Sequence, residues 1–282
     1  MTDSGSRRKF WLLMPLLVFF GLFVAAPLLL LAGVSLFDDA AMTQTGVGQY
    51  VKFLGDGFNR GILLETLGLA FSAVVISMLI GYPVAYAYVL LPRRWQTLLM
   101  FIILMPLLTS SVVRTFAWVV ILGREGLINQ SLLSLGLIAA PLKLLYTQGA
   151  VAIAVAQIEV PMMILPLISS MSAIDPQLRH ASTALGAGHW RTFRQIIFPL
   201  SVPGLLAGTL LVFTASASAF VTQTLVGGGR MIFMPFYIYQ QAIQSQNYPF
   251  AATITMVLLA SVLGIVSLIN FLGRKSVGFI HG

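Results

Sequence analysis

The chain of 282 residues has no cysteine and little charge. The lack of cysteine excludes disulfide bonds, thiolate nucleophiles and thiolate metal ligands. Charged residues make up 9% of the chain, whereas soluble domains carry roughly 25%, and this difference argues against a water-soluble fold. Because 58% of the residues are hydrophobic, the sequence predicts an all-α integral membrane protein.

The chain also lacks the motifs of ATP chemistry and of catalysis. No G-x-x-x-x-G-K-[ST] phosphate-binding loop occurs, and the glycine-rich stretch at 226–230 lacks the strand-to-helix context of one. His180, His189 and His281 have neither metal-ligand spacing nor acidic neighbours, and no serine stands in a Ser-His-Asp arrangement. We therefore expect no catalytic residue, no metal site and no cofactor in this chain.

Six apolar segments are long enough to cross a bilayer, which takes about 20 apolar residues. They cover about 10–36, 62–91, 97–122, 148–172, 201–225 and 250–273. The first segment is too long for the apolar core of a cleavable signal peptide and has no small-residue cleavage site, so we expect it to be retained. The sequence thus predicts one transmembrane domain over 1–282, with helices kinked at their internal prolines.

Basic residues between the segments predict the orientation, because cytoplasmic loops of membrane proteins are enriched in lysine and arginine. With a cytoplasmic N-terminus, ten basic residues lie inside and five outside. The inner ten are Arg7, Arg8, Lys9, Arg93, Arg94, Arg179, Arg191, Arg194, Arg274 and Lys275, and the outer five are Lys52, Arg60, Arg124, Lys143 and Arg230. We expect both termini in the cytoplasm, and we interpret the net charge of +8 as an orientation signal rather than nucleic-acid binding.

The largest cytoplasmic loop, residues 175–200, is predicted to be a helix–turn–helix, and we call it the insert. Asp175 is a capping carboxylate, and Pro176 occupies the first helical position. Gly186 breaks the first helix, since glycine adopts a positive φ without strain. A second helix is expected to start near His189.

The second helix of the insert is expected to end at Pro199, where the fifth span begins. Trp190 and Phe193 lie on one side of this helix, and Arg191 and Arg194 lie on another. One interpretation is an amphipathic hairpin that rests on anionic membrane lipid.

The spacing of the insert also resembles the EAA loop of binding-protein-dependent ABC importer permeases. That family has E-A-A-x-x-x-G, nine residues, and then I-x-x-P. The residues that match are Ala181, Gly186, Ile196 and Pro199, while His180 replaces the glutamate and Ser182 replaces the second alanine. Further stretches look like permeases of the spermidine/putrescine type, namely 109–129, 160–178, 198–220 and "YPFAAT" at 248–253.

This resemblance implies a type I importer fold of six spans in the bacterial inner membrane. It implies that the insert is a coupling helix that docks in a groove of a cytoplasmic ABC ATPase. The ATPase-coupling residues would be His180, Ala181, Ser182, Gly186, Ala187, Trp190, Arg191, Arg194, Ile196 and Pro199. The implied complex contains a second homologous permease in a heterodimer, two ATPase subunits that bind ATP and magnesium, and an extracytoplasmic solute-binding protein.

Arg114 and Glu159 lie within apolar segments, where a charged residue costs about 2.5–3.5 kcal/mol. With straight helices that rise about 1.5 Å per residue, Arg114 lies about 12 Å from the outer end of its span and Glu159 about 16 Å down its own. Two interpretations remain open. The pair forms an internal salt bridge, or Glu159 faces the translocation path and attracts a cationic solute while Arg114 serves architecture or gating.

Aromatic and amide residues add a second candidate for the path. Tyr82, Tyr86, Trp118 and Gln157 could build an amine-binding wall through cation–π contacts, and helix packing is the alternative role. We expect the solute to be a polyamine or related cationic amine; an opine, an amino acid, thiamine or ferric ion is the alternative. An ion-driven secondary carrier would require inverted repeats and discontinuous spans, and the sequence predicts neither. A membrane-embedded enzyme is disfavoured by the absence of a catalytic constellation.

Overall fold

The computed structural model describes residues 14–278, with side chains as far as residue 273. Every regular element in this range is a helix, and the one pairing of extended backbone is an isolated bridge between Phe37 and Thr45. The predicted all-α class is therefore confirmed. Some residues that entered the sequence predictions lie outside the described residues or side chains: residues 10–13 of the first span, and Arg7, Arg8, Lys9, Arg274, Lys275 and His281.

The chain divides into two compact units, one of residues 1–61 and 237–260 and the other of residues 62–236 and 261–282. The first unit contains the helix from residue 14 through α2 (Ala26–Val34), the short α3 (Gly48–Gly55) and the start of α14 (Tyr248–Gly278). None of the residues of α2 is buried, as expected of a helix whose side chains face lipid. The Thr253 hydroxyl donates to the Ser35 carbonyl oxygen at 3.3 Å and holds the two ends of this unit together.

Five helices are long and apolar enough to cross a membrane. They are Met14–Val34, Gly57–Leu90, Gln148–Ser172, His189–Ala217 and Tyr248–Gly273. The helices predicted at 62–91, 148–172 and 250–273 are confirmed, and the first is confirmed from residue 14. Prolines inside α4 (Gly57–Leu90) and α8 (Gln148–Ser172) do not interrupt them.

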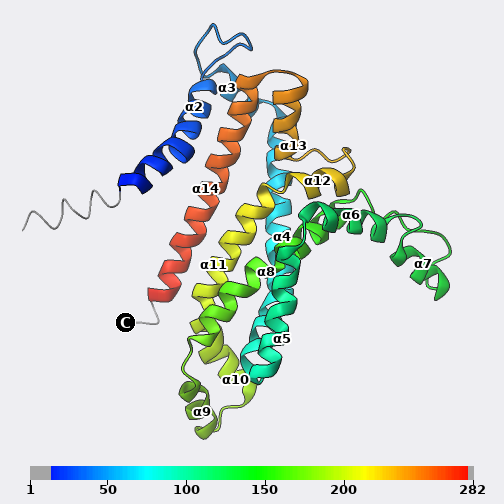
Figure 1. Ribbon diagram of the computed structural model, residues 1–282, viewed down its shortest axis with the longest axis vertical. Helices are drawn as coiled ribbons and strands as arrows, with labels where there is room; N and C mark the ends of the chain where they lie inside the picture. The colour runs from blue at the N-terminus through cyan, green and yellow to red at the C-terminus, as the bar shows by residue number, and fades with distance from the viewer. Residues whose placement is uncertain (1–13, 279–282) are drawn as a thin grey trace, which may run out of the picture. The chain divides into compact units, whose positions relative to one another are not determined.

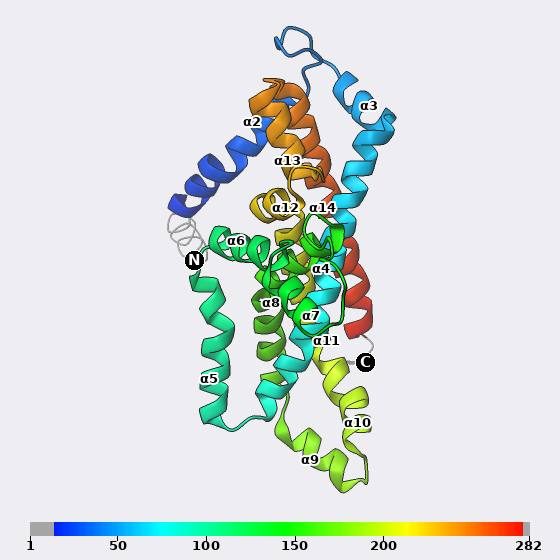
Figure 2. The same ribbon diagram turned by 90° about the vertical axis from the view of Figure 1, so that its right-hand side faces the viewer.

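The third predicted span is broken, so the prediction of one helix over 97–122 is wrong. The chain forms α5 (Arg93–Leu104) and a 3₁₀ turn at Met105–Leu108, and it then turns through 94° into α6 (Ser111–Leu122) and α7 (Leu127–Ser134). Pro106 has no N–H for the helical ladder, and the Thr109 hydroxyl donates to its carbonyl oxygen at 2.8 Å. Figure 2 shows α6 running across the direction of α5. If this bent pair counts as one span, the described chain has six.

The fifth predicted span, 201–225, is also discontinuous. α11 (Phe198–Ala217) ends at Ala217, and a separate helix α12 (Phe220–Gly227) follows. The Ser218 hydroxyl donates back to the carbonyl oxygens of Thr214 at 3.1 Å and Ala215 at 3.2 Å, a local bonding pattern that competes with helix continuation. The prediction that no span is discontinuous is therefore wrong at two places.

α8 and α11 run side by side through the second unit (Figure 1). Their close approach depends on Gly204 and Gly208, which are spaced four residues apart on α11. A Cβ at position 204 would lie 2.5 Å from the carbonyl oxygen of Pro166, and one at position 208 would lie 3.1 Å from that of Met163. Only glycine lets the two backbones pack this closely.

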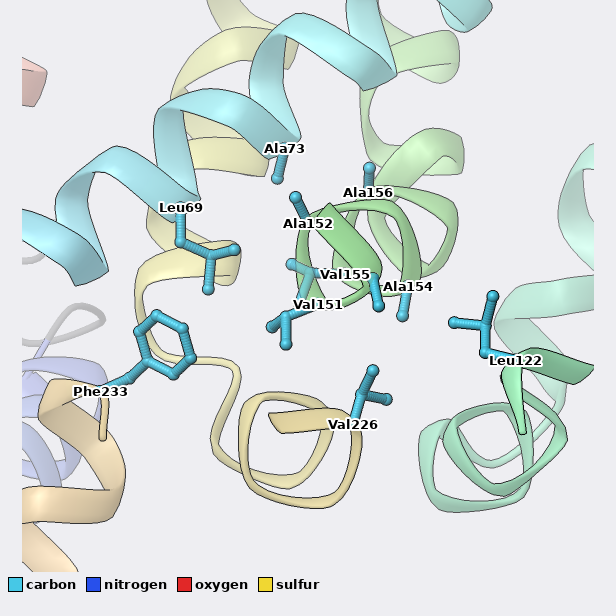
Figure 3. Packing of buried hydrophobic residues seen from close by; sticks show 11 residues of the cluster. Leu69, Ala73, Leu122, Val151, Ala152, Ala154, Val155, Ala156, Val226 and Phe233 are labelled. Atoms are coloured by element: carbon cyan, nitrogen blue, oxygen red, sulfur yellow. The ribbon is translucent and has the colours of Figure 1, made fainter. Parts of the chain in front are cut away.

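The hydrophobic core of the second unit surrounds the N-terminal half of α8. Figure 3 shows Val151 and Val155 of α8 between Leu69 of α4 and Val226 of α12, with Leu122 of α6 closing another side. Between membrane helices, such side chains stabilise the structure through van der Waals packing rather than through removal from water. This core fixes the position of α6 and α12, the two short helices that follow the breaks.

Candidate functional site

The insert folds as the sequence predicts over its first half. α9 (Pro176–Ala184) begins at Asp175, whose carboxylate accepts the backbone N–H of Gln177 at 2.8 Å. It ends in a turn where Gly186 has a φ of +77°. Two backbone bonds close this turn, from Ala187 N to the Ser182 oxygen and from Gly186 N to the Thr183 oxygen, which is the Schellman pattern.

One side-chain hydrogen bond ties the two helices of the insert to each other. The hydroxyls of Ser182 on α9 and Thr192 on α10 (His189–Thr192) lie 2.8 Å apart, and both residues are buried. Ser182 is one of the two departures from the family pattern, and an alanine there would have no hydroxyl for this bond. No sequence pattern pointed to Thr192, because its partner becomes known only once the turn is folded.

The second helix of the insert was predicted to end at Pro199, and this prediction is wrong. α10 continues through a π-helical turn at Phe193–Ile197 directly into α11, so one unbroken helix runs from His189 to Ala217. The N–H of Phe198 donates to the carbonyl oxygen of Phe193, five residues back. This wide turn accommodates Pro199, which lacks an N–H and would clash with the preceding turn of a regular α-helix. The second helix of the insert is therefore a continuous extension of α11.

An aromatic cluster fastens the insert to α4 as well. The ring of Phe193 contacts Tyr82 and Tyr86 of α4 with centroids 5.8 Å and 5.3 Å apart, and it stacks on Trp190 at 5.5 Å. The Tyr82 hydroxyl lies 2.7 Å from the Ser201 hydroxyl of α11. A groove of about 450 Å³ runs beside these rings, with Pro83 and His189 in its wall.

The predicted coupling residues form an exposed surface around this core. Trp190 is 72% exposed, and Leu185 in the turn, which was not among the predicted residues, is 88% exposed. Burying such large apolar side chains against a partner would be favourable. Most of the other predicted residues are exposed and some are half-buried: His180, Ala181, Gly186, Arg191 and Arg194 are exposed, and Ala187, Ile196 and Pro199 are half-buried.

The predicted path residues separate into two groups. Tyr82 and Tyr86 of α4 belong to the aromatic cluster of the insert. Trp118 of α6 and Gln157 of α8 contact each other instead, and the Trp118 indole N–H donates to the Gln157 side-chain oxygen at 3.2 Å. Trp118 and Gln157 line an apolar cavity of about 410 Å³ in which neither tyrosine takes part. The four residues thus do not form a single wall.

Arg114 and Glu159 lie close together in the structure but are not bonded to each other. The Arg114 guanidinium Nη1 donates to the carbonyl oxygen of Ile158 at 3.4 Å, and in the described chain it makes no ion pair with the Glu159 carboxylate. The internal salt bridge, one of the two interpretations, is thus not formed in this geometry, and the bend of the third span changes the depth inferred for Arg114. Glu159 is 8% exposed.

Buried polar side chains near the two breaks were not predicted. The hydroxyls of Thr115 on α6 and Thr222 on α12 lie 2.9 Å apart, and both residues are buried. The Gln223 amide donates to the Ser216 carbonyl oxygen at 2.8 Å and so bridges the gap between α11 and α12. A hydropathy pattern could not reveal these contacts, because the threonine pair joins helices distant in the sequence and the Gln223 bond depends on where α11 ends. Within the described range, no group of histidine and acidic residues is arranged to hold a metal ion.

Comparison with known proteins finds a matching family and related permeases. The family model of the binding-protein-dependent transport system inner membrane component matches residues 73–274. The spermidine/putrescine transport system permease protein PotB of Escherichia coli (strain K12) is 33% identical over 252 residues, covering 88% of this chain and 91% of that protein. The putative 2-aminoethylphosphonate transport system permease protein PhnU of Salmonella typhimurium (strain LT2) is 29% identical, covering 96% of this chain and 94% of that protein.

A solved structure shares the fold. A chain of the bacterial alginate ABC transporter, crystallised in complex with an alginate pentasaccharide-bound periplasmic protein, superposes with a TM-score of 0.81 at 17% identity. The superposition covers 98% of this chain and 99% of that one. At this identity the likeness establishes the fold alone.

Proposed function

Since the chain belongs to the family of binding-protein-dependent transport system inner membrane components, and is a permease subunit of an ABC importer in the inner membrane, we propose that its insert receives the motion of a separate ATPase. The observation that carries this proposal is the unbroken helix from His189 to Ala217. A push on the second helix of the insert is transmitted along that helix into the membrane, because no loop lies between His189 and Ala217. The first helix, α9, is joined to it by the glycine turn and by the Ser182–Thr192 hydrogen bond.

The contact surface of the insert suits a protein groove. Leu185 and Trp190 present apolar area at its tip, and Arg191 and Arg194 surround this area with positive charge. Large aromatic and aliphatic side chains at the centre of a polar rim are typical of protein interfaces. We assign Tyr82 and Tyr86 to this coupling contact rather than to the solute path, because both pack on Phe193.

The proposed orientation in the membrane and the subunits of the complete importer belong together. We propose a type I importer fold over residues 1–282 with six spans, the bent α5–α6 pair counting as one, and with both termini and the insert in the cytoplasm. The complete importer would contain a second, related permease as a heterodimer partner, two ATPase subunits and an extracytoplasmic binding protein. ATP and magnesium would bind to the ATPases, so this chain would need no cofactor.

The solute is proposed to be a cationic amine of the polyamine class. Two relatives are named for amine-containing solutes, spermidine/putrescine and 2-aminoethylphosphonate. Glu159 is buried in a membrane-spanning helix, and the guanidinium of Arg114 donates to the carbonyl oxygen of Ile158 rather than to the Glu159 carboxylate. A carboxylate in this position would favour an ammonium group in the path, with Trp118 and Gln157 close by.

The test of the coupling role is to alter the exposed tip of the insert. We expect Leu185→Asp or Trp190→Ala to prevent co-purification of the ATPase with the permease pair and to abolish uptake into proteoliposomes. Leu137→Asp, at a 66% exposed leucine of the α7–α8 loop, is the matched control and should retain the ATPase. Retention of the ATPase by both insert variants would contradict the proposal.

A further inference from the structure

Three basic side chains converge on one cavity at the outer end of the second unit. Arg124, Lys143 and Arg230 line a space of about 300 Å³ together with Tyr146 and three leucines. They come from three different loops, those between α6 and α7, between α7 and α8, and after α12. No acidic side chain lines the cavity.

A buried asparagine holds two of these loops in place. The Asn129 side-chain NH₂ donates to the carbonyl oxygens of Gly123 and Leu142, each at 3.0 Å, and its oxygen accepts the N–H of Leu142 at 2.8 Å. Asn129 is 0% exposed, so these bonds are shielded from water. They fix the residues that immediately precede Arg124 and Lys143.

A tyrosine holds the third loop. A Cβ at Gly228 would lie 2.3 Å from the Tyr146 ring, so this glycine, with a φ of +63°, packs directly on the aromatic face. The Arg230 guanidinium lies 6.0 Å from the centroid of the same ring, in a cation–π contact. All three cations are therefore presented by ordered backbone rather than by free loops.

We propose that this basic cavity is a docking point for acidic side chains on the extracytoplasmic binding protein, an inference that rests on the proposed function and orientation. Three like charges around one small space repel one another, and an entering carboxylate relieves that repulsion. A cationic solute would be repelled by the same charges, so the cavity serves a macromolecular partner rather than the solute. Complementary charge at such a surface raises the association rate and fixes the register of the complex.

The position of the three cations favours a protein over a lipid headgroup. Basic lipid sites in membrane proteins lie between spans and on the cytoplasmic side. Here the three residues are exposed, lie on connecting loops and belong to the predicted outer side. A protein that docks on this face would contact all three basic side chains at once.

The experiment measures binding of the binding protein to the complete importer in nanodiscs, at low and at high salt. We expect Arg124→Gln, Lys143→Gln and Arg230→Gln each to lower the association rate constant by about threefold at low salt, and the triple variant by about tenfold or more. The triple variant should also lose most of the salt dependence. ATPase activity at saturating binding protein should stay unchanged. Arg60→Gln, an exposed cation of the same predicted side that does not line the cavity, is the matched control and should bind as wild type.

An unchanged rate and salt dependence in the triple variant would overturn the proposal. An effect that disappears when the nanodiscs contain only zwitterionic lipid would assign the cavity to anionic headgroups and would also overturn it. If the wild-type complex itself fails to bind the binding protein, the proposed function fails instead, so the two failures are distinguishable.

Discussion

The ring of Phe193 meets the ring of Tyr86 edge to face, with centroids 5.3 Å apart. The backbone of Phe193 belongs to the helix that becomes α11, and Tyr86 belongs to α4. One residue of the insert is thus attached to two membrane helices, to one covalently and to the other by ring packing. This arrangement predicts that motion of the insert moves both helices together.

Removal of the Phe193 ring should separate ATP hydrolysis from transport. In Phe193→Ala the contacts to Tyr82 and Tyr86 are lost, and we expect uptake to fall about tenfold while the ATPase remains bound, because Leu185 and Trp190 are still in place. Each aromatic pair contributes about 0.5–1.5 kcal/mol beyond its burial. The measurement is solute transported per ATP hydrolysed in proteoliposomes. Phe193→Tyr keeps the ring and should preserve the ratio, and an unaltered ratio in the alanine variant would contradict the role.

The α8–α11 contact should not tolerate even one methyl group. We expect Gly204→Ala to lower the free energy of unfolding by about 1–3 kcal/mol, because its Cβ would lie 2.5 Å from the carbonyl oxygen of Pro166 and the backbones would have to separate. Gly264→Ala is the matched control, since a Cβ there has nothing within 4 Å. Thermal or denaturant unfolding in detergent measures both. Equal stability of the two variants would show that the close approach is not required.

The buried hydroxyl pair of Thr115 and Thr222 should show energetic coupling between α6 and α12. Thr115→Val removes the partner of the Thr222 hydroxyl, and Thr222→Val leaves the Thr115 hydroxyl with only its bond to the Ser111 carbonyl oxygen at 2.8 Å. The double variant removes both hydroxyls. We expect the double variant to lose about 0.6–1.7 kcal/mol less than the sum of the single losses. Unfolding free energies of the four proteins give this quantity. Strict additivity would mean that the 2.9 Å contact contributes nothing.

Neutralising Glu159 should weaken transport without affecting assembly. In Glu159→Gln the shape is kept and the charge is lost, and we expect uptake of a polyamine to fall about tenfold or more, as for loss of a hydrogen bond to a charged group. Glu65→Gln removes an exposed carboxylate from α4 and serves as the control. Undiminished uptake by Glu159→Gln would remove this residue from the solute path.

Much of the fold could be predicted from hydrophobic run length, and the breaks could not. The bounds of α8 agree with the predicted 148–172 because its apolar run ends in a threonine cap at one end and in Ser172 at the other. The 94° turn after Leu108 and the gap after Ala217 lie inside apolar runs, where hydropathy does not change. Local bonding by Thr109 and Ser218 ends these helices, and such bonding is invisible in a hydrophobicity profile.

The helix cap and the glycine turn of the insert could be predicted from the sequence, but its continuation into α11 and its contact with α4 could not. Asp175 and Gly186 have strong positional preferences, and both behave as predicted. Pro199 was taken as a helix end because proline lacks an N–H, and the π-helical turn that accommodates it has no sequence signature. For Tyr82 and Tyr86 the sequence left open a role in the solute path or in helix packing, since sequence alone does not reveal that Phe193 lies against them.

The most direct test of coupling uses a single cysteine at the exposed tip of the insert, in a chain that has none of its own. Leu185→Cys, labelled with a short photoactivatable crosslinker in the assembled importer, should yield a covalent product with the ATPase, and Leu137→Cys should yield none. A Leu185→Cys product with lipid alone, unchanged by adding or removing the ATPase, would contradict the claim that the insert is the point where force enters this permease.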